Sequence, residues 1–178
     1  MSELKALAAL LRKRKQIDVE ISKIIGRPSI PQHIGEFIAS RIFSIRLEVS
    51  ATTKGIDGVF VEGPLKRKTV NIKLYGKQEG ILDIALENLA DYYLVLTGPK
   101  SPPATSRGES RPVVIDHAYL FEMKDLVDKI GKRGIKIGVA TSVAKSYWEE
   151  AEMYPKQTNR RLKLTKEQIR FLKLFSTQ

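Results

Sequence analysis

The strongest constraint on the fold comes from two strand-like runs separated by a short basic turn. Residues 58–62 (GVFVE) and 69–75 (TVNIKLY) are rich in β-branched and aromatic side chains, which favour a pleated strand. Between them, residues 63–68 (GPLKRK) begin with a Gly-Pro turn signal. The pattern predicts a β-hairpin over residues 54–76. A turn centred on Leu65 pairs residues whose numbers sum to 130.

The predicted register brings polar groups together at one edge of the sheet. It places Asp57 opposite Lys73. Because successive side chains of a strand point to opposite faces, Asn71 and Lys73 share one face and the apolar residues between and beside them point toward a core. A carboxylate, an amide and an ammonium group therefore gather at this edge. We interpret this cluster as a candidate functional site.

The scarcity of cysteine and histidine limits the chemistry that the chain can perform. The 178 residues include no cysteine and only two histidines, His33 and His117. Disulfides, thiol nucleophiles and cysteine-based metal sites are excluded. A histidine-rich metal site or a histidine-dependent triad is poorly supported. We therefore expect any metal to be bound by carboxylates, which are the ligands that hard ions such as Mg²⁺ prefer.

The charge balance indicates a polyanionic partner. Lysine and arginine number 31 against 20 acidic residues, which gives a net charge of +11 and a pI near 9.8. A surplus of this size on a small domain favours nucleic acid, and the alternative is the charged surface of a thermophile. No apolar run reaches the length of a membrane span, and the N-terminal residues lack a signal-peptide pattern. A cytoplasmic protein with no membrane contact is therefore expected.

Helical and strand-like segments alternate along the chain. This order predicts an α/β fold in which helices flank a central mixed β-sheet. The length favours one domain, with N-terminal helices over residues 1–25, a core over 34–155 and a C-terminal helix over 162–178. Within the core we predict strands at 44–50, 91–98, 113–121 and 135–140, helices at 34–43, 122–134 and 143–154, and a surface loop at 100–112. Residues 81–89 fit either a short helix or an extended crossing.

Capping signals mark two helix starts. Thr141 and Ser142 are suited to cap the helix that we predict over residues 143–154. Thr165 and Gln168 have the Thr-x-x-Gln spacing of a capping box, which predicts the start of the C-terminal helix.

The order of the polar residues resembles that of a known superfamily. Helix-borne Glu36, then Asp57 at the hairpin start, then Asn71-Ile72-Lys73 on the return strand is similar to the motif of the PD-(D/E)xK nucleases, which have the restriction-endonuclease-like fold. The resemblance covers residues 34–98. Residues 113–175, through GVATSVAKSYWEEAEMYP, resemble an uncharacterised prokaryotic branch tied to that fold.

The resemblance implies a function and roles for these residues. It implies a DNA endonuclease, a hydrolase of phosphodiester bonds, that uses Mg²⁺ with Mn²⁺ as an alternative ion. Asp57 would bind the metal, Glu36 would support it and Lys73 would be catalytic. It also implies a central mixed sheet with helices on both faces.

One residue departs from the family pattern. Asn71 stands where the family usually has Glu, Asp or sometimes Gln, and a neutral amide oxygen holds a cation more weakly than a carboxylate does. Glu62, Glu79 or Asp83 could supply the missing charge, and we favour Asp83 as a second metal ligand. The alternative function is a catalytically inactive nucleic-acid-binding protein on the same fold.

The basic residues of the hairpin are candidate DNA contacts. Lys66, Arg67 and Lys68 at the tip, and Lys77 after the return strand, are suited to phosphate contact. The plainer interpretation of the tip is a solvated turn. In the same way, the Asp57–Lys73 contact could be a structural salt bridge, and Glu36 a partner of the helix dipole.

A third function class rests on the N-terminal helices. Residues 2–25 carry leucines and isoleucines at helical spacing. They favour a role in oligomerisation, for which a homodimer is the simplest assembly.

Overall fold

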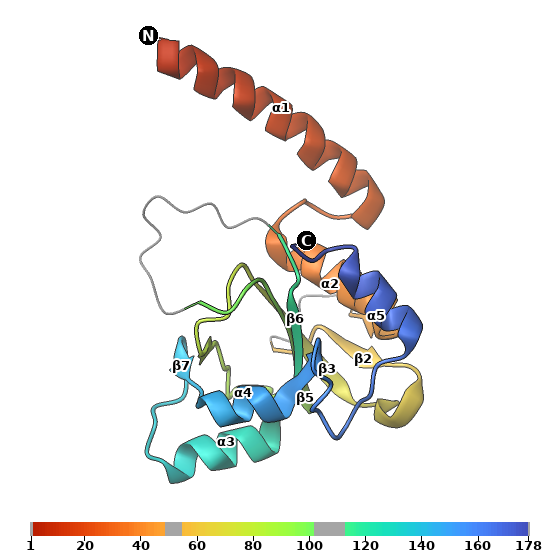
Figure 1. Ribbon diagram of the computed structural model, residues 1–178, viewed down its shortest axis with the longest axis vertical. Coiled ribbons are helices and arrows are strands. Elements are labelled where there is room, and N and C mark those ends of the chain that lie inside the picture. The colour runs from red at the N-terminus through yellow and green to blue at the C-terminus, as the bar shows by residue number, and fades with distance from the viewer. Residues whose placement is uncertain (1, 49–54, 102–112, 178) are drawn as a thin grey trace.

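The computed structural model describes residues 2–48, 55–101 and 113–177 (Figure 1). Its centre is a six-stranded mixed sheet in the order β1-β2-β3-β5-β6-β8, and β4 and β7 form a separate two-stranded sheet. The strands are β1 (Ile45–Leu47), β2 (Gly58–Phe60), β3 (Thr69–Tyr75), β4 (Ile81–Leu82), β5 (Tyr92–Thr97), β6 (His117–Glu122), β7 (Thr141–Ser142) and β8 (Glu152–Tyr154). The helices are α1 (Ser2–Ile25), α2 (Pro31–Ile42), the 3₁₀ helix η1 (Gly63–Leu65), α3 (Met123–Lys132), α4 (Lys145–Ala151) and α5 (Lys166–Lys173). The predicted α/β fold is confirmed.

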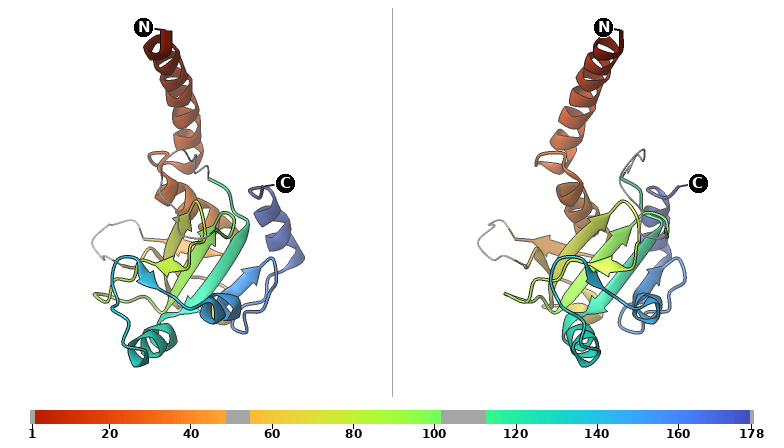
Figure 2. Two further views of the ribbon diagram at one scale, coloured as in Figure 1. Left: turned by 60° about the vertical axis from the view of Figure 1, so that its left-hand side comes forward. Right: turned by 90° about the vertical axis from the view of Figure 1, so that its left-hand side faces the viewer.

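Helices cover both faces of the six-stranded sheet (Figure 2). On one face α2 and α5 pack on a core that contains Ile72 and Leu94. On the other face α3 and α4 pack on a second core that contains Tyr93 and Val95. The alternation predicted for β3 is confirmed, because Val70 and Ile72 are fully buried in the first core.

The hairpin exists, but its predicted register is wrong by two residues. β2 pairs with β3 through Gly58↔Val70 and Val59↔Thr69, so partner numbers sum to 128. The turn is not symmetric about Leu65, because it contains η1 and has Arg67 in the left-handed region with a φ of 70°. Asp57 is therefore not the cross-strand partner of Lys73.

Two other segments differ from the sequence prediction. Residues 135–140 form no strand, and β7 follows them. The predicted helix over 143–154 is shorter, because its last residues form β8 and pair with β6 through Ala118↔Tyr154. Tertiary pairing at the sheet edge outweighs the helical pattern there. Thr141 and Ser142 do not cap α4. They pair with β4 instead, and Ala144 is the N-cap.

Other expectations agree with the structure. The run at 91–98 is the fully buried β5, which pairs with β3 in parallel and β6 in antiparallel orientation. The segment 81–89 contains no helix: it begins with β4 and has a turn at residues 87–88. The capping box between Thr165 and Gln168 is confirmed, and the Gln168 side chain also donates to the Ile42 carbonyl, which ties α5 to α2. Residues 49–50 of one predicted strand and 102–112 of the predicted loop lie outside the described residues.

The N-terminal segment is one continuous helix. α1 projects away from the rest of the protein (Figures 1 and 2), and none of its residues is buried. It is followed by a turn and by α2, which begins at Pro31. Proline is suited to this first helical position because it lacks the N–H that would have no partner there. In the described ranges, no helix is long and apolar enough to cross a membrane.

Candidate active site

The candidate site lies along the edge of β3 that β2 leaves open. β2 pairs only with Thr69 and Val70, and among the described residues no strand pairs with the rest of β3 on that side. Side chains take the place of the strand at Ile72. Its N–H donates to Asp57 Oδ2 at 2.7 Å, and its carbonyl accepts from Gln32 Nε2 at 2.8 Å. The backbone N–H and carbonyl of Ile72 are thus both satisfied by residues that form the site.

Asp57 is held between the backbone of β3 and three charged side chains. Its own N–H donates to the Val70 carbonyl at 2.9 Å, which fixes it at the start of β2. Burial raises the pKa of Asp57 above its ordinary value, and the negative charge of Glu36 raises it further. The Ile72 N–H bond and the charges of Lys73 and Arg27 act in the opposite direction, but burial prevails.

Glu36 reaches the site because α2 packs very closely on β3. Gly35 faces Leu74, and a Cβ atom at position 35 would lie 2.7 Å from the Leu74 Cβ. The Glu36 side chain is buried; its Oε1 accepts from Gln32 Nε2 at 2.9 Å, and its Oε2 forms a salt bridge with Arg27. Glu36 lies beyond the first turn of α2, so it is not a partner of the helix dipole.

Lys73 lies over an aromatic ring beside the same carboxylates. Its Nζ is 5.7 Å from the centroid of the Tyr93 ring, which is within reach of a cation–π interaction. The charge of Asp57 in turn contributes to the raised pKa of Tyr93, after the larger effect of burial. The described residues show no direct ion pair between Asp57 and Lys73. Lys73 therefore does not form a structural salt bridge with Asp57 in this structure.

Asn71 has a buried oxygen without a hydrogen-bond partner. It precedes Lys73 by two residues on β3, so the two side chains share a face. Its Oδ1 is shielded from solvent and accepts no hydrogen bond. Leaving such an atom unsatisfied costs about 1–3 kcal/mol. A cation bound at this oxygen would remove that cost.

The oxygen atoms at the site suit a hard cation, but their negative charge is low. Asp57 and Glu36 supply two carboxylates and Asn71 supplies a neutral oxygen, all ligands that Mg²⁺ accepts. Within the described ranges, no three His, Cys, Asp or Glu side chains gather as a metal-binding group. These residue types would suit a divalent ion held by fewer charges than usual, and both Glu36 oxygens already have protein partners.

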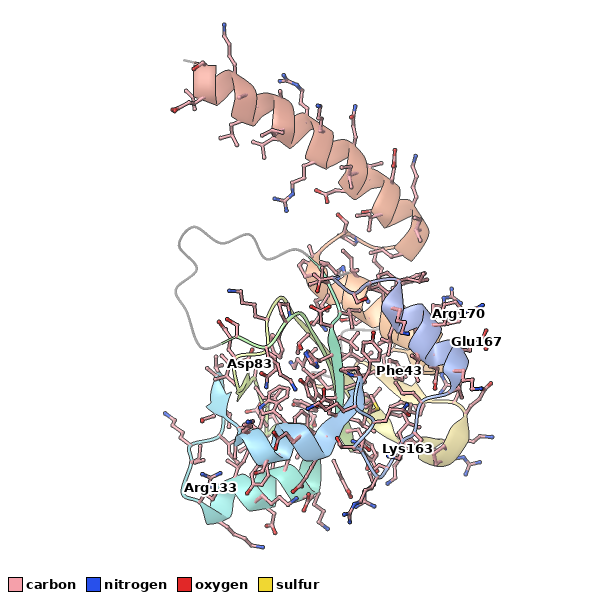
Figure 3. The ribbon with its side chains drawn as sticks, viewed as in Figure 1. Phe43, Asp83, Arg133, Lys163, Glu167 and Arg170 are labelled. Atoms are coloured by element: carbon pink, nitrogen blue, oxygen red, sulfur yellow. The ribbon has the colours of Figure 1, made fainter. Side chains whose placement is uncertain are left out.

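The role of Asp83 as a second metal ligand stays a prediction, and its carboxylate is bonded to other groups in this structure. Asp83 is labelled in Figure 3. Its Oδ1 accepts from the Ala140 N–H at 2.7 Å, and its Oδ2 accepts from the Tyr75 hydroxyl at 3.4 Å. These bonds hold Asp83 beside β4 and the segment that precedes β7. Glu62 accepts from Ser44 Oγ at 3.3 Å, beyond the other end of β2 from Asp57. Neither carboxylate is among the charged groups that shift the pKa of Asp57.

The basic hairpin tip does not lie beside the site. Lys66, Arg67 and Lys68 follow η1, whereas Asp57 lies at the opposite end of β2. At about 3.3 Å per strand residue, this separation is on the order of 10 Å. Lys68 is paired with Asp91, at 3.2 Å between Nζ and Oδ1. Phosphate contact by the tip stays a prediction, and such contact would lie away from Asp57. Lys77 follows β3 and is half-buried.

Sequence reasoning missed two residues that organise the site. Arg27 pairs with Glu36, and Gln32 bridges Glu36 to the Ile72 carbonyl. Gln32 precedes Glu36 by one helical turn, and this spacing is a signal that could have identified it. Arg27 lies in the turn between α1 and α2, where no periodic pattern marks it.

Comparison with known proteins adds no further assignment. No family model matches the chain, and no curated protein matches it. The function is therefore argued from the residues of the site.

Proposed function

We propose that this protein is a Mg²⁺-dependent endonuclease that hydrolyses DNA phosphodiester bonds with a PD-(D/E)xK-type site. One observation carries the proposal. Glu36 from α2 and Lys73 from β3 each act electrostatically on Asp57, which precedes β2 and bonds the Ile72 N–H at the open edge of β3. Three elements that are separate in sequence thus bring two carboxylates and an ammonium group to one place. The net charge of +11 supports a polyanionic substrate.

The residues have separable roles in this proposal. Asp57, Glu36 and the Asn71 oxygen would hold the ion, with Mn²⁺ as an alternative to Mg²⁺. The ion supplies a more acidic water and neutralises charge on the scissile phosphate. Lys73 stabilises the negative charge that develops on the attacking or leaving oxygen. The Tyr93 ring stabilises the Lys73 ammonium through a cation–π interaction, and Gln32 orients Glu36 through a hydrogen bond.

A second candidate function is nucleic-acid binding without cleavage. Both oxygens of Glu36 already have partners, Arg27 and Gln32, and Asn71 brings no charge. Arg27 thus already neutralises the carboxylate that a metal ion would need. In this alternative the Arg27–Glu36 salt bridge takes the place of a metal ion, and the basic surface binds the DNA backbone.

Cleavage of plasmid DNA in Mg²⁺ or Mn²⁺ tests the proposal. We expect wild-type protein to cut, and Lys73→Ala to cut at least about 100-fold more slowly. Lys132→Ala is the control for charge, because Lys132 lies on α3 and pairs with Asp128 there. Its rate should equal that of wild type. Equal cleavage by the Lys73→Ala variant would refute the assigned site. DNA binding that weakens with salt, without cleavage in either ion, would support the second function.

Asn71→Asp is expected to tighten metal binding. The change adds a negative charge to the site, and we expect Mg²⁺ affinity to rise about tenfold, equivalent to about 1.4 kcal/mol. Without metal, the variant should melt at a lower temperature than wild type because the added carboxylate is buried beside another. Mg²⁺ should raise its melting temperature more than that of wild type. Melting curves across a Mg²⁺ titration measure both effects, and Asn71→Ala is the control. A Mg²⁺ response unchanged by Asn71→Asp would exclude this residue from the metal site.

A further inference from the structure

The apolar residues of α1 are exposed to solvent. Leu4 and Ile24 are each 71% exposed, and the other large apolar exposed side chains of the helix are Leu7, Leu10, Leu11, Ile17 and Val19. Most stability of a protein helix comes from packing of its apolar face, and no residue of α1 is fully buried. Only the C-terminal part of the helix, with the half-buried Ile21 and Ile25, lies near the rest of the chain. Exposed apolar residues in this number on one helix mark an interaction site.

The spacing of the α1 residues defines a coiled-coil seam. Positions 4, 7, 11, 14, 18, 21 and 25 are separated alternately by three and four residues, as the a and d positions of a heptad are. In order, they are Leu4, Leu7, Leu11, Arg14, Asp18, Ile21 and Ile25. The seam is apolar at both ends and carries one cation and one anion at its centre.

We propose that α1 forms an antiparallel coiled coil with α1 of a second copy of this chain. In this register, facing residues have numbers that sum to 32. Arg14 faces Asp18 of the second copy, and the two-fold axis repeats this ion pair. Leu11 then packs on Ile21 of the second copy, and Leu7 packs on Ile25. Every a position meets a d position, as an antiparallel pair requires.

Charge complementarity selects this orientation. In a parallel pair, Arg14 would face Arg14 and Asp18 would face Asp18 at the centre of the seam, and like charges in direct contact are unfavourable. Within one chain, Arg14 and Asp18 already lie 3.6 Å apart as an exposed pair. Such surface pairs contribute little stability. Replacing this ion pair within one helix by an ion pair with a second helix therefore costs little stability.

The positions beside the seam support the same pairing. On one side are Leu10, Ile17 and Ile24, so that Ile17 lies near its own copy at the two-fold axis and Leu10 lies near Ile24. These contacts widen the apolar interface. On the other side Lys15 meets its own copy at the rim. This like-charge contact opposes the pairing, and its cost is reduced because the long side chains extend to water.

An open hollow lies beside the seam, on the side of Lys15. It has a volume of about 890 Å³ and is lined by the turn before α2 and by Leu11, Arg14, Lys15, Asp18, Val19, Ser22 and Lys23 of α1. Of these α1 residues, Leu11, Arg14 and Asp18 belong to the seam, so the hollow adjoins the seam. The proposal is independent of the nuclease activity.

The mass of the full-length protein in solution tests the proposal. Sedimentation should give the mass of two chains rather than the 20.1 kDa of one. Arg14→Asp and Asp18→Arg should each weaken the dimer by at least about tenfold, because each places like charges in the seam. The double reversal should restore wild-type affinity to within about threefold. A single-chain mass at all concentrations, or no recovery in the double variant, would overturn the proposal.

Disulfide trapping tests the orientation, since the chain contains no native cysteine. Ile17→Cys should form an intermolecular disulfide, because Ile17 lies near its own copy. Leu4→Cys should not, because its copies lie at opposite ends of a helix about 36 Å long. Efficient linkage through Leu4→Cys would indicate a parallel pair and overturn the proposal. Melting of the α/β body should be unchanged in all variants, which confirms that they fold.

Discussion

The Asp57→Asn variant is expected to lose metal-dependent cleavage and yet to melt at a higher temperature than wild-type protein. Asparagine retains an oxygen that can accept from the Ile72 N–H. It removes a negative charge that is costly in this position, because burial and Glu36 raise the pKa of Asp57 above 3.8. The same charge is the one that the proposed mechanism requires.

The pH dependence of this effect has a defined sign. A carboxyl whose pKa is raised by folding contributes stability below its unfolded pKa, and this stability is lost as pH rises through the folded pKa. The gain in melting temperature of Asp57→Asn should therefore be present at pH 7 and fade at acidic pH. A gain of about 1 kcal/mol corresponds to about 2–4 °C in a protein of this size. Differential scanning calorimetry at pH 7 and at acidic pH measures the gain in melting temperature.

Asp91→Asn is the matched control and should behave oppositely. Burial alone would raise the pKa of Asp91, but hydrogen bonds from Thr69 and from Lys68 outweigh it and lower the pKa. The ionised carboxyl therefore stabilises the fold above its unfolded pKa, and this contribution disappears on acidification. Asp91→Asn should melt lower than wild type at pH 7. If Asp57→Asn also melted lower at pH 7, the interpretation of Asp57 as a strained functional carboxylate would be wrong.

Gly35→Ala is expected to reduce both stability and cleavage. The new methyl group would lie 2.7 Å from the Leu74 Cβ, which is closer than real contacts allow. Since the Leu74 Cβ is fixed to the backbone of β3, the helix or the strand must move, at a cost of about 1–3 kcal/mol. The displaced helix carries Gln32 and Glu36 away from Ile72. Cleavage should therefore fall at temperatures where the variant remains folded.

Gly131→Ala separates this effect from the general consequence of replacing a glycine. Gly131 lies in α3, and a Cβ atom there meets nothing within 4 Å. Alanine should stabilise that helix by about 0.5–1 kcal/mol. Chemical denaturation of both variants measures the difference. A Gly35→Ala variant as stable as Gly131→Ala would show that α2 tolerates a wider spacing from β3 than the structure indicates.

The sequence predicts the core of the fold better than its edges. β5 is recognisable because all six of its residues are buried, which requires an uninterrupted apolar run. β8 was predicted as helix because its three residues follow α4 and are strand only through pairing with β6. The shift of the hairpin register has a similar cause. It depends on η1 and on the backbone of Arg67, which composition alone does not reveal.

In the candidate site too, contacts that are local in sequence could be predicted and long-range contacts could not. Asp57 and Lys73 could be predicted to be neighbours because the hairpin is local in sequence. The predicted reason for their proximity was nevertheless wrong, since Asp57 bonds the backbone of Ile72 rather than facing Lys73. The bond from the Ala140 N–H to Asp83 could not be predicted, because the two residues are 57 apart in sequence and a contact of that kind is set by the tertiary fold.

The open edge of β3 has a further consequence for the behaviour of the protein in concentrated solution. A bare strand edge invites pairing with another chain and therefore aggregation. Here Asp57 occupies the N–H of Ile72 and Gln32 occupies its carbonyl, so an incoming strand finds neither group free. The side chains that build the site thus also protect the sheet against strand addition. Selection for solubility alone would retain them.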